Sequence, residues 1–453
     1  MENIPEMVRK AGLYCEIFPE VRSWDILGGT ISGSSISIEK GFLKTSESST
    51  EYSINIRLFG ERGKTGSVNI SKMNLPFIRS AIDRTVSLMK GSLPNPEFKF
   101  LSQPPSSYPP INTPYDSKVK DVSFDDTKEI IDQFIRLKSR DDRIVSVSGG
   151  FSYYDIQYIL LNSNGINLEN KESTVSLYAE VIMEEILKGK KENSNGYEGQ
   201  SYIFFDKVNP EEIFNKALHK AQKGLKKSKI PTGYYPVVCA PPVVILLFNR
   251  TLSAALDAQT VYERRSFLSN QLGNQIASDN LEILDDPWLQ EGLATSAWDM
   301  EGTATQPIKL VENGVLKSYL HNVYTANLFE TVSTGHASRG LNSISVGISP
   351  SNLKILPGKN SLDSMIESIP QGVLIEASYD YPNIVTGEFS GLIASGYLIH
   401  DGEIKDALRE SLIGINFSEF YNNITGIGKK IHRKGPHYVP YIKVDDVKVS
   451  AKE

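Results

Sequence analysis

The chain has little of what marks a secreted or membrane-spanning protein. Its 453 residues include only two cysteines, Cys15 and Cys239, each among apolar neighbours, so we expect buried free thiols rather than a disulfide framework. The N-terminal sequence MENIPEMVRK contains no apolar core of a secretory signal. The longest apolar run, 236–248, is too short to span a bilayer and contains three prolines. We therefore expect a cytoplasmic protein without a membrane partner.

The chain also lacks an excess of positive charge. Lysine and arginine number 48 and aspartate and glutamate 54, which gives a formal net charge of -6 and a pI of about 5.7. A protein of this charge needs a local basic patch to bind nucleic acid. The clearest candidate is the short run 429–434, so we do not expect nucleic acid as a partner. The apolar fraction of 40% is that of an ordinary globular protein with well-buried cores.

The first half of the chain alternates helical and strand patterns. Apolar residues at helical spacing predict helices over 4–14, 73–91, 123–141 and 209–230, with Ser123 as the N-cap of the third. Strand-like runs occur at 15–21, 35–46, 52–70, 143–166 and 173–187. The seven prolines between Pro94 and Pro114 exclude regular structure there. Helix followed by strands occurs twice, which indicates either an internal duplication or the chance similarity common among α+β proteins.

The sequence pattern of the second half differs from that of the first and indicates a β-rich region. A buried strand at 236–240 precedes a helix from Val243 to Ala258, with Pro242 near its start. Hairpins are expected to turn at Asn313-Gly314 and Asp401-Gly402, both of which suit two-residue turns. The sequence therefore predicts an α+β protein with an N-terminal α+β domain over 1–230 and a β-rich C-terminal domain over 231–453.

The common catalytic motifs are missing. The sequence contains no GxSxG elbow, no P-loop, no GxGxxG after a strand and no HExxH pair. Four of the six histidines are scattered, and we expect surface or hydrogen-bonding roles for them: His219, His321, His336 and His400. Four acidic residues could act as paired carboxylates in general acid–base catalysis: Asp285, Asp286, Asp299 and Glu301. Their sequence contexts, Asp-Asp-Pro and Asp-x-Glu-Gly, favour turns instead. The remaining histidines, His432 and His437, stand five positions apart in KKIHRKGPHYVP, and spacing alone leaves open a metal site, a nucleic-acid contact or a solvated loop.

Four segments of the second half carry a family resemblance. In chain order they are GTATQPIKLVENGVLKSYLHNVYTANLF, STGHASRG, SNLKILPG and VTGEFSGLIASGYLIHDGEI. They resemble the C-terminal region of the TldD/PmbA family, also called TldD/TldE and formerly labelled a modulator of DNA gyrase. INIRLFGERGKTGSVN and YILLNSNGI of the first half agree more loosely. The resemblance implies an intracellular proteolytic system built of two paralogous subunits.

The resemblance also implies where zinc ligands would stand. TldD-type members carry a HExxxH helix whose histidines hold zinc together with a cysteine near the C-terminus, and PmbA/TldE-type members lack these residues. Counting back from GNQIAS puts the three motif positions at Asn249, Arg250 and Ala254, and counting back from Val439 puts the cysteine position at His432. An amide is a poor zinc ligand, a guanidinium has no acceptor and a methyl group offers nothing. We therefore expect no metal in this chain and a metal-free His432, with His437 as a solvated loop residue.

These observations predict a PmbA/TldE-like subunit that has no cofactor of its own. We expect it to pair with a zinc-bearing TldD-like paralogue as a heterodimer, or with itself, and to help bind unfolded peptide by strand addition. Four arginines are candidate peptide or partner contacts: Arg250, Arg264, Arg265 and Arg339. The alternatives are an independent hydrolase that uses Asp299, Glu301, His336 or His432, and a regulator linked to DNA gyrase.

Overall fold

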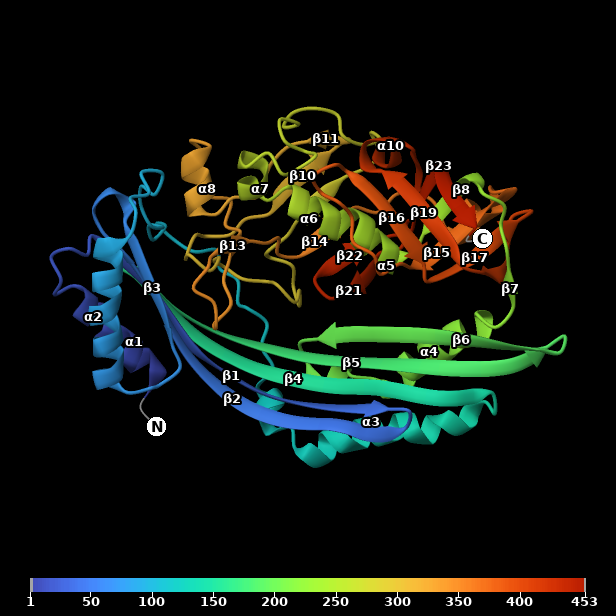
Figure 1. The fold of residues 1–453 in the computed structure, drawn as a ribbon, viewed down its shortest axis with the longest axis horizontal. Helices are drawn as coiled ribbons and strands as arrows, with labels where there is room; N and C mark the ends of the chain where they lie inside the picture. Colours follow the sequence, from blue (N-terminus) through green and yellow to red (C-terminus); the bar gives the residue numbers. More distant parts are fainter. Residues whose placement is uncertain (1–2, 452–453) are drawn as a thin grey trace.

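The computed structural model describes residues 3–451, and in it two β-rich halves face each other (Figure 1). The first half is a long, curved antiparallel sheet with helices on one face. The second half is made mostly of shorter strands. The predicted α+β class is confirmed. Within the described residues, no helix combines the length and apolar character needed to cross a membrane.

The first sheet has six antiparallel strands in the order β3-β2-β1-β4-β5-β6. Its strands are β1 (Ser23–Glu39), β2 (Phe42–Phe59), β3 (Thr65–Ile70), β4 (Ile144–Asn162), β5 (Asn167–Leu187) and β6 (Lys190–Tyr202). Strand β5 is longer than the sequence predicts, since it has 21 residues and the predicted strand begins only at residue 173. The strand predicted over 15–21 is wrong, because a helix ends at Cys15 and turns follow. Strand β6 was not predicted.

Four helices cover one face of this sheet. They are α1 (Ile4–Cys15), α2 (Leu75–Gly91), α3 (Phe124–Leu137) and α4 (Pro210–Lys223). Ile26 packs with α1 and α2, and Ile36 of the same strand packs with α3 and α4. Residues ten apart on a regular strand lie on the same face, so both helix pairs cover the same side. The predicted N-cap is confirmed, because Ser123 and Asp126 form a reciprocal capping box.

The element order repeats within the first half. Each repeat is a helix, three antiparallel strands and a second helix, and the first strands of the two repeats, β1 and β4, pair at the centre of the sheet. This arrangement agrees with the duplicated order seen in the sequence. The proline-rich segment between the repeats contains no helix or strand over 92–116, as predicted. It touches the second half, where the Tyr108 hydroxyl donates a hydrogen bond of 2.9 Å to the carbonyl of Gly302.

The second half contains two larger sheets and one strand pair. The nine-stranded sheet comprises β7 (Lys227–Ser228), β8 (Gly233–Cys239), β15 (Gln371–Ala377), β16 (Glu388–Ile393), β17 (Ser395–His400), β18 (Glu403–Leu408), β19 (Ser411–Asn416), β20 (Ile424–Ile427) and β23 (Ile442–Ala451). The six-stranded sheet comprises β9 (Ile283–Asp285), β10 (Ile308–Glu312), β11 (Val315–Leu316), β14 (Leu353–Ile355), β21 (His432–Lys434) and β22 (His437–Val439), and β12 (Ala337–Ser338) pairs with β13 (Gly347–Ile348). Both predicted hairpin turns are confirmed, with Asn313 and Asp401 at positive φ.

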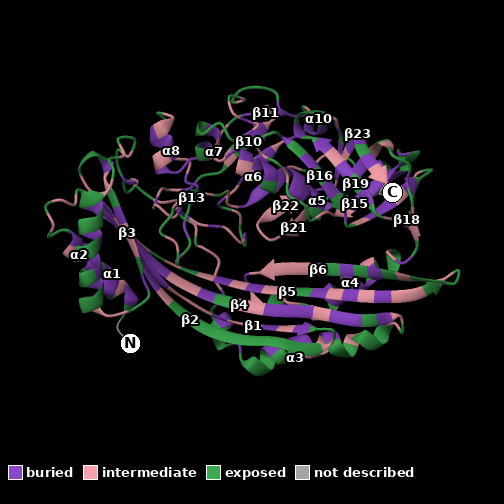
Figure 2. Cartoon of the chain, in the orientation of Figure 1, coloured by how far each residue is buried: buried purple, intermediate pink, exposed green. Residues whose placement is uncertain are grey.

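The main core of the second half lies between its two larger sheets. A buried helical segment runs through it as α5 (Pro241–Val244), a π-helical turn η5 (Ile245–Arg250) and α6 (Thr251–Ala255). The predicted helix over 243–258 therefore ends early, because Asp257 caps a separate helix, α7 (Ala258–Tyr262). The other short helices are α8 (Val323–Leu328), α9 (Leu362–Glu367) and α10 (Phe417–Asn422). Figure 2 shows α5 and α6 largely buried, whereas the first part of β2 is exposed.

Candidate functional site

The buried helical segment 241–255 carries the positions at which the family resemblance places zinc ligands. Asn249 is fully buried in the π-helical turn, and its amide nitrogen lies 3.4 Å from the carbonyl oxygen of Leu353 on β14. The same nitrogen lies 3.2 Å from Nδ1 of His437. Its side-chain oxygen has no hydrogen-bond partner in residues 3–451. The amide nitrogen thus links the helix to the six-stranded sheet.

His437 differs from the expectation of a solvated loop residue. It begins strand β22 of the hairpin β21–β22, opposite Lys434. Burial, together with the charge of Arg250, lowers the pKa of His437 to about 4. The ring is therefore neutral at pH 7. His437, and not His432, is the histidine that contacts the helix position Asn249.

His432 lies at the far end of the same hairpin and faces Tyr441, with ring centroids 5.3 Å apart. Burial lowers its pKa, and the charges of Lys430 and Lys216 lower it further. Ala254 is partly buried on α6 and offers only a methyl group. Within residues 3–451, no three His, Cys, Asp or Glu side chains form a group that could hold a metal ion. Because the side chains at the four motif positions are an amide, a guanidinium, a methyl group and a single imidazole, they do not fit a zinc ion.

A cavity of about 360 Å³ opens beside the helix, between it and the sheet of the first half. Leu246 and Arg250 line it from the helix side. Glu198 of β6 and Lys434 of β21 line it from the opposite side and are in direct contact with each other. Lys220 of α4 also reaches Glu198, at 2.8 Å. The cavity is thus built from both halves of the chain.

Positively charged side chains outnumber carboxylates around this cavity. Glu198 is 5% exposed, and each of its oxygens contacts one lysine. Burial lowers the pKa of Lys434 to about 8, while the carboxylate beside it favours the charged form. Arg250 is exposed, and it makes no hydrogen bond or ion pair with any other described residue. The site can therefore offer a free guanidinium to an incoming group.

Strand β6 forms one wall of this site and is an edge of the first sheet. In Figure 1 it runs along the side of the sheet that faces hairpin β21–β22 and α5. An edge strand presents unpaired backbone N–H and C=O groups to which an extended chain can pair. Strand β6 has no apolar alternation in its sequence, because its inward-facing residues include Ser194, Gly196 and Glu198.

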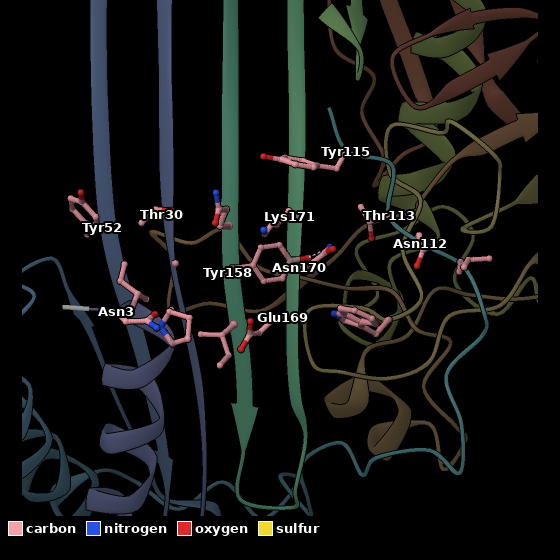
Figure 3. Close-up of a pocket in the computed structure, with 18 residues that line it drawn as sticks. Asn3, Thr30, Tyr52, Asn112, Thr113, Tyr115, Tyr158, Glu169, Asn170 and Lys171 are labelled. Atoms are coloured by element: carbon pink, nitrogen blue, oxygen red, sulfur yellow. Dashed lines mark hydrogen bonds between the residues drawn. The ribbon is translucent and has the colours of Figure 1, made fainter. Parts of the chain in front are cut away.

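A second cavity, of about 630 Å³, lies away from the helical segment. Figure 3 shows its labelled side chains, which come from the residue before α1, from strands β1, β2, β4 and β5, and from the proline-rich crossing. Within it, the amide of Asn170 donates a hydrogen bond of 2.9 Å to the Tyr158 hydroxyl. Burial raises the pKa of Tyr158 well above its ordinary value, so the phenol stays protonated. None of the residues chosen from the sequence as site candidates lines this cavity.

A buried cluster of charges joins the two halves elsewhere. Arg57 of β2 donates to Asp25 of β1 through Nε, at 2.9 and 3.0 Å, and its guanidinium lies 3.6 Å from Glu301 of the second half. Arg339 of the second half lies 2.8 Å from Asp25. Burial opposes ionisation of Asp25, but the two arginines hold its pKa below the ordinary value. The expectation that Arg339 contacts a peptide or partner is replaced by this placement, because its side chain is 0% exposed.

The residues of the alternative hydrolase do not form an open site. Asp299 accepts backbone N–H groups from Glu301, Thr303 and Ala337, which makes it a turn former. Burial, and then the charge of Glu301, raises the pKa of Asp299 to about 7. His336 is buried 3.0 Å from Asp285, and His432 belongs to the separate hairpin. Neither the cavity beside the helix nor the cavity of about 630 Å³ is lined by any of these side chains.

The two remaining arginine candidates lie on the surface after α7. Arg264 has a positive φ of 56°, and Arg265 pairs with Glu263. Neither lines the cavity beside the helix. Of the four arginines selected from the sequence, Arg250 alone does so.

With this geometry in place, the chain can be compared with known proteins. Three sequence models of the PmbA/TldA metallopeptidases match it: domain 1 over residues 24–90, the central domain over 117–225 and the C-terminal domain over 232–451. The chain belongs to the PmbA/TldD metallopeptidase family.

Individual relatives cover nearly the whole chain. An uncharacterized protein of Methanocaldococcus jannaschii is 28% identical over 425 residues, 93% of each chain. The metalloprotease PmbA homologue of Buchnera aphidicola is 25% identical, over 92% of this chain and 91% of its own length. A metalloprotease TldD homologue of Buchnera aphidicola is 24% identical, over 87% of this chain and 83% of its own length. Relatives named for PmbA and relatives named for TldD are thus both similar to this chain.

Solved structures share the fold. TldE from Thermococcus kodakarensis superposes with a TM-score of 0.88 and 22% identity, covering 98% of this chain and 100% of that one. A Thermotoga maritima protein that was proposed as a modulator of a DNA gyrase superposes with a TM-score of 0.86 and 23% identity, covering 98% and 99%. At these identities the likeness concerns the fold.

Proposed function

We propose that this chain is a PmbA/TldE-like subunit without zinc that binds extended peptide for a zinc-bearing TldD-like partner. The observation that carries the proposal concerns the buried helix that contains the positions of the metallopeptidase zinc motif. There, the buried amide of Asn249 contacts Leu353 and His437, and Arg250 faces the cavity where a catalytic base would be needed. A guanidinium stays protonated and cannot accept a proton from water. The chain's own residues can bind and orient a substrate, whereas hydrolysis belongs to the partner.

Peptide binding is supported by the position of β6. This edge strand lines the cavity beside the helix, and backbone pairing along it would hold an unfolded chain with little regard to side chains. Leu246, Ile245 and Pro242 give the cavity an apolar side. The charged residues then lie where the substrate backbone would pass.

The partner is inferred from the family together with the missing donors. A metallopeptidase family member whose motif positions cannot hold zinc requires another chain for metal-dependent cleavage. A heterodimer with a TldD-like paralogue meets this requirement. A homodimer of this chain would not.

The experiment is a reconstitution with purified full-length chain and a HExxxH-bearing paralogue from the same genome. We expect the two to co-elute, the zinc to be carried by the paralogue, and cleavage of an unfolded test peptide to be faster for the pair than for the paralogue alone. A variant of the paralogue whose motif glutamate is changed to glutamine, which removes the catalytic base and keeps the zinc ligands, is the control for contaminating protease. Stoichiometric zinc and chelator-sensitive cleavage by this chain alone would overturn the proposal.

A further inference from the structure

The cavity beside the helix has one cation more than its carboxylates can pair. Lys220, Lys434 and Arg250 line it together with the carboxylates Glu198 and Glu376. Both oxygens of Glu198 are taken by the two lysines. Glu376 accepts from the hydroxyl of Ser395, at 3.4 Å, on the strand next to it. Although Glu376 lines the same cavity, the Arg250 guanidinium forms no ion pair with it or with any other carboxylate in residues 3–451.

The surroundings of Arg250 keep its charge uncompensated. The neighbouring imidazole of His437 is neutral at pH 7, because burial and the positive charge of Arg250 disfavour its protonated form. Leu246 and Ile245 contribute apolar surface to the same cavity beside the exposed guanidinium. A guanidinium in this setting prefers a planar anion that can take two hydrogen bonds.

We propose that this cavity binds a carboxylate group of the peptide substrate, with Arg250 as its principal contact and Lys434 as the second cation. This inference rests on the proposed peptide-binding function and adds the part of the peptide that enters the cavity. The carboxylate can come from the peptide's C-terminus or from an acidic side chain. Strand β6 lies at the cavity wall, so a peptide paired with it would bring its end or a side chain within reach of Arg250.

The test uses the full-length chain and three octapeptides of alternating threonine and serine, each with an uncharged coumarin dye coupled to its N-terminus. The first peptide has a free C-terminal carboxylate, and the second has a C-terminal amide. The third also has a C-terminal amide, but its last residue is glutamate. Fluorescence anisotropy measures the dissociation constant of each for the wild type and for Arg250→Gln. Arg84→Gln, an exposed arginine on α2 at the other end of the sheet, is the matched control for the loss of one charge.

We expect the wild type to bind at least one of the carboxylate-bearing peptides about tenfold more tightly than the plain amide, a ratio that corresponds to about 1.4 kcal/mol. Preference for the first peptide identifies the C-terminal carboxylate, and preference for the third identifies an acidic side chain. Arg250→Gln should reduce the ratio to about twofold or less, while Arg84→Gln preserves it.

Two results would overturn the inference and can be told apart. If all three peptides bind the wild type with equal affinity, the carboxylate site is wrong and peptide binding stands. If none of the three binds, peptide binding by this chain fails, and the carboxylate site fails with it. A preference for carboxylate that survives in Arg250→Gln would also contradict the assignment of Arg250.

Discussion

Two charged clusters in this chain have similar composition and different surroundings. At the contact between the halves, Arg57 and Arg339 share Asp25, with Glu301 beside them, and all four side chains are largely buried. At the cavity beside the helix, two lysines share Glu198, and the exposed Arg250 side chain has no ion-pair partner in residues 3–451. A sealed cluster in which each charge has a counterion holds parts of a structure together. An open cluster with a spare cation is suited to binding.

The largest expected effect comes from breaking the sealed cluster. Arg57→Met leaves Asp25 and Glu301 buried with less compensating charge, and removal of one partner from a buried ion pair costs about 3–5 kcal/mol of unfolding free energy. Urea denaturation followed by circular dichroism measures it. Arg22→Met, which removes an exposed pair with Glu61, should leave the unfolding midpoint unchanged. Equal midpoints for the Arg57 variant and the wild type would show that the sealed cluster does not stabilise the fold.

A smaller loss is expected at the open cluster. Lys434→Met removes one of the two lysines on Glu198, but Lys220 remains within 2.8 Å, so we expect a loss of about 1–2 kcal/mol by the same urea assay. Adding Glu198→Gln in the same chain should recover part of this loss, because the buried carboxylate is then neutral. Lys216→Met, from the exposed pair with Glu212, is the control. A loss as large as that of Arg57→Met would erase the distinction between the clusters.

The pH dependence of stability tests the neutral imidazole next to the open cluster. The folded-state pKa of His437 is about 4, below the unfolded value of about 6.5, so the unfolded chain binds more protons between these pH values. Stability should therefore fall as the pH drops from 6.5 toward 4. At pH 5 His437 accounts for up to about 2 kcal/mol of that fall, and His437→Gln should remove this part. Identical slopes of unfolding free energy against pH for wild type and variant would mean that His437 is accessible to protons in the folded state.

The smallest expected effect on stability is that of Arg250→Gln. Since Arg250 has no partner among the described residues and is exposed, its replacement should leave the urea midpoint within error of the wild type. Peptide affinity is the property that should change. A clear loss of stability would instead show that Arg250 stabilises the fold. The open cluster would then have the same structural role as the sealed cluster.

Local signals in the sequence predicted many of the elements correctly. The Asn-Gly and Asp-Gly pairs define their hairpins, and the capping box at Ser123 starts α3, because these depend on neighbouring residues alone. Strand β6 was missed because its buried side is made of small or polar residues, which carry no apolar alternation. The strand that forms a wall of the candidate site therefore had no recognisable pattern.

The candidate site was predicted only in part, because it depends on distant contacts. Arg339 pairs with Asp25 across 314 positions of the chain, which no local pattern reveals. His437 and His432 looked equivalent in sequence, but the turn at Gly435 places His437 opposite Lys434 and against the helix. The positions Asn249 and Arg250 were identified by their spacing from a family motif. Their partners came from the three-dimensional arrangement.

The π-helical turn at 245–250 determines which side chain of the buried helical segment reaches the cavity beside it. A π-helical turn holds more residues than an α-helical turn, so it changes the direction in which the residues after it point. Residues 245–249 of this turn are all buried, whereas Arg250, its last residue, is exposed. A change that restored regular α-helical winding here would rotate Arg250 relative to the core, so the direction of this guanidinium depends on the backbone of the turn as well as on its own side chain.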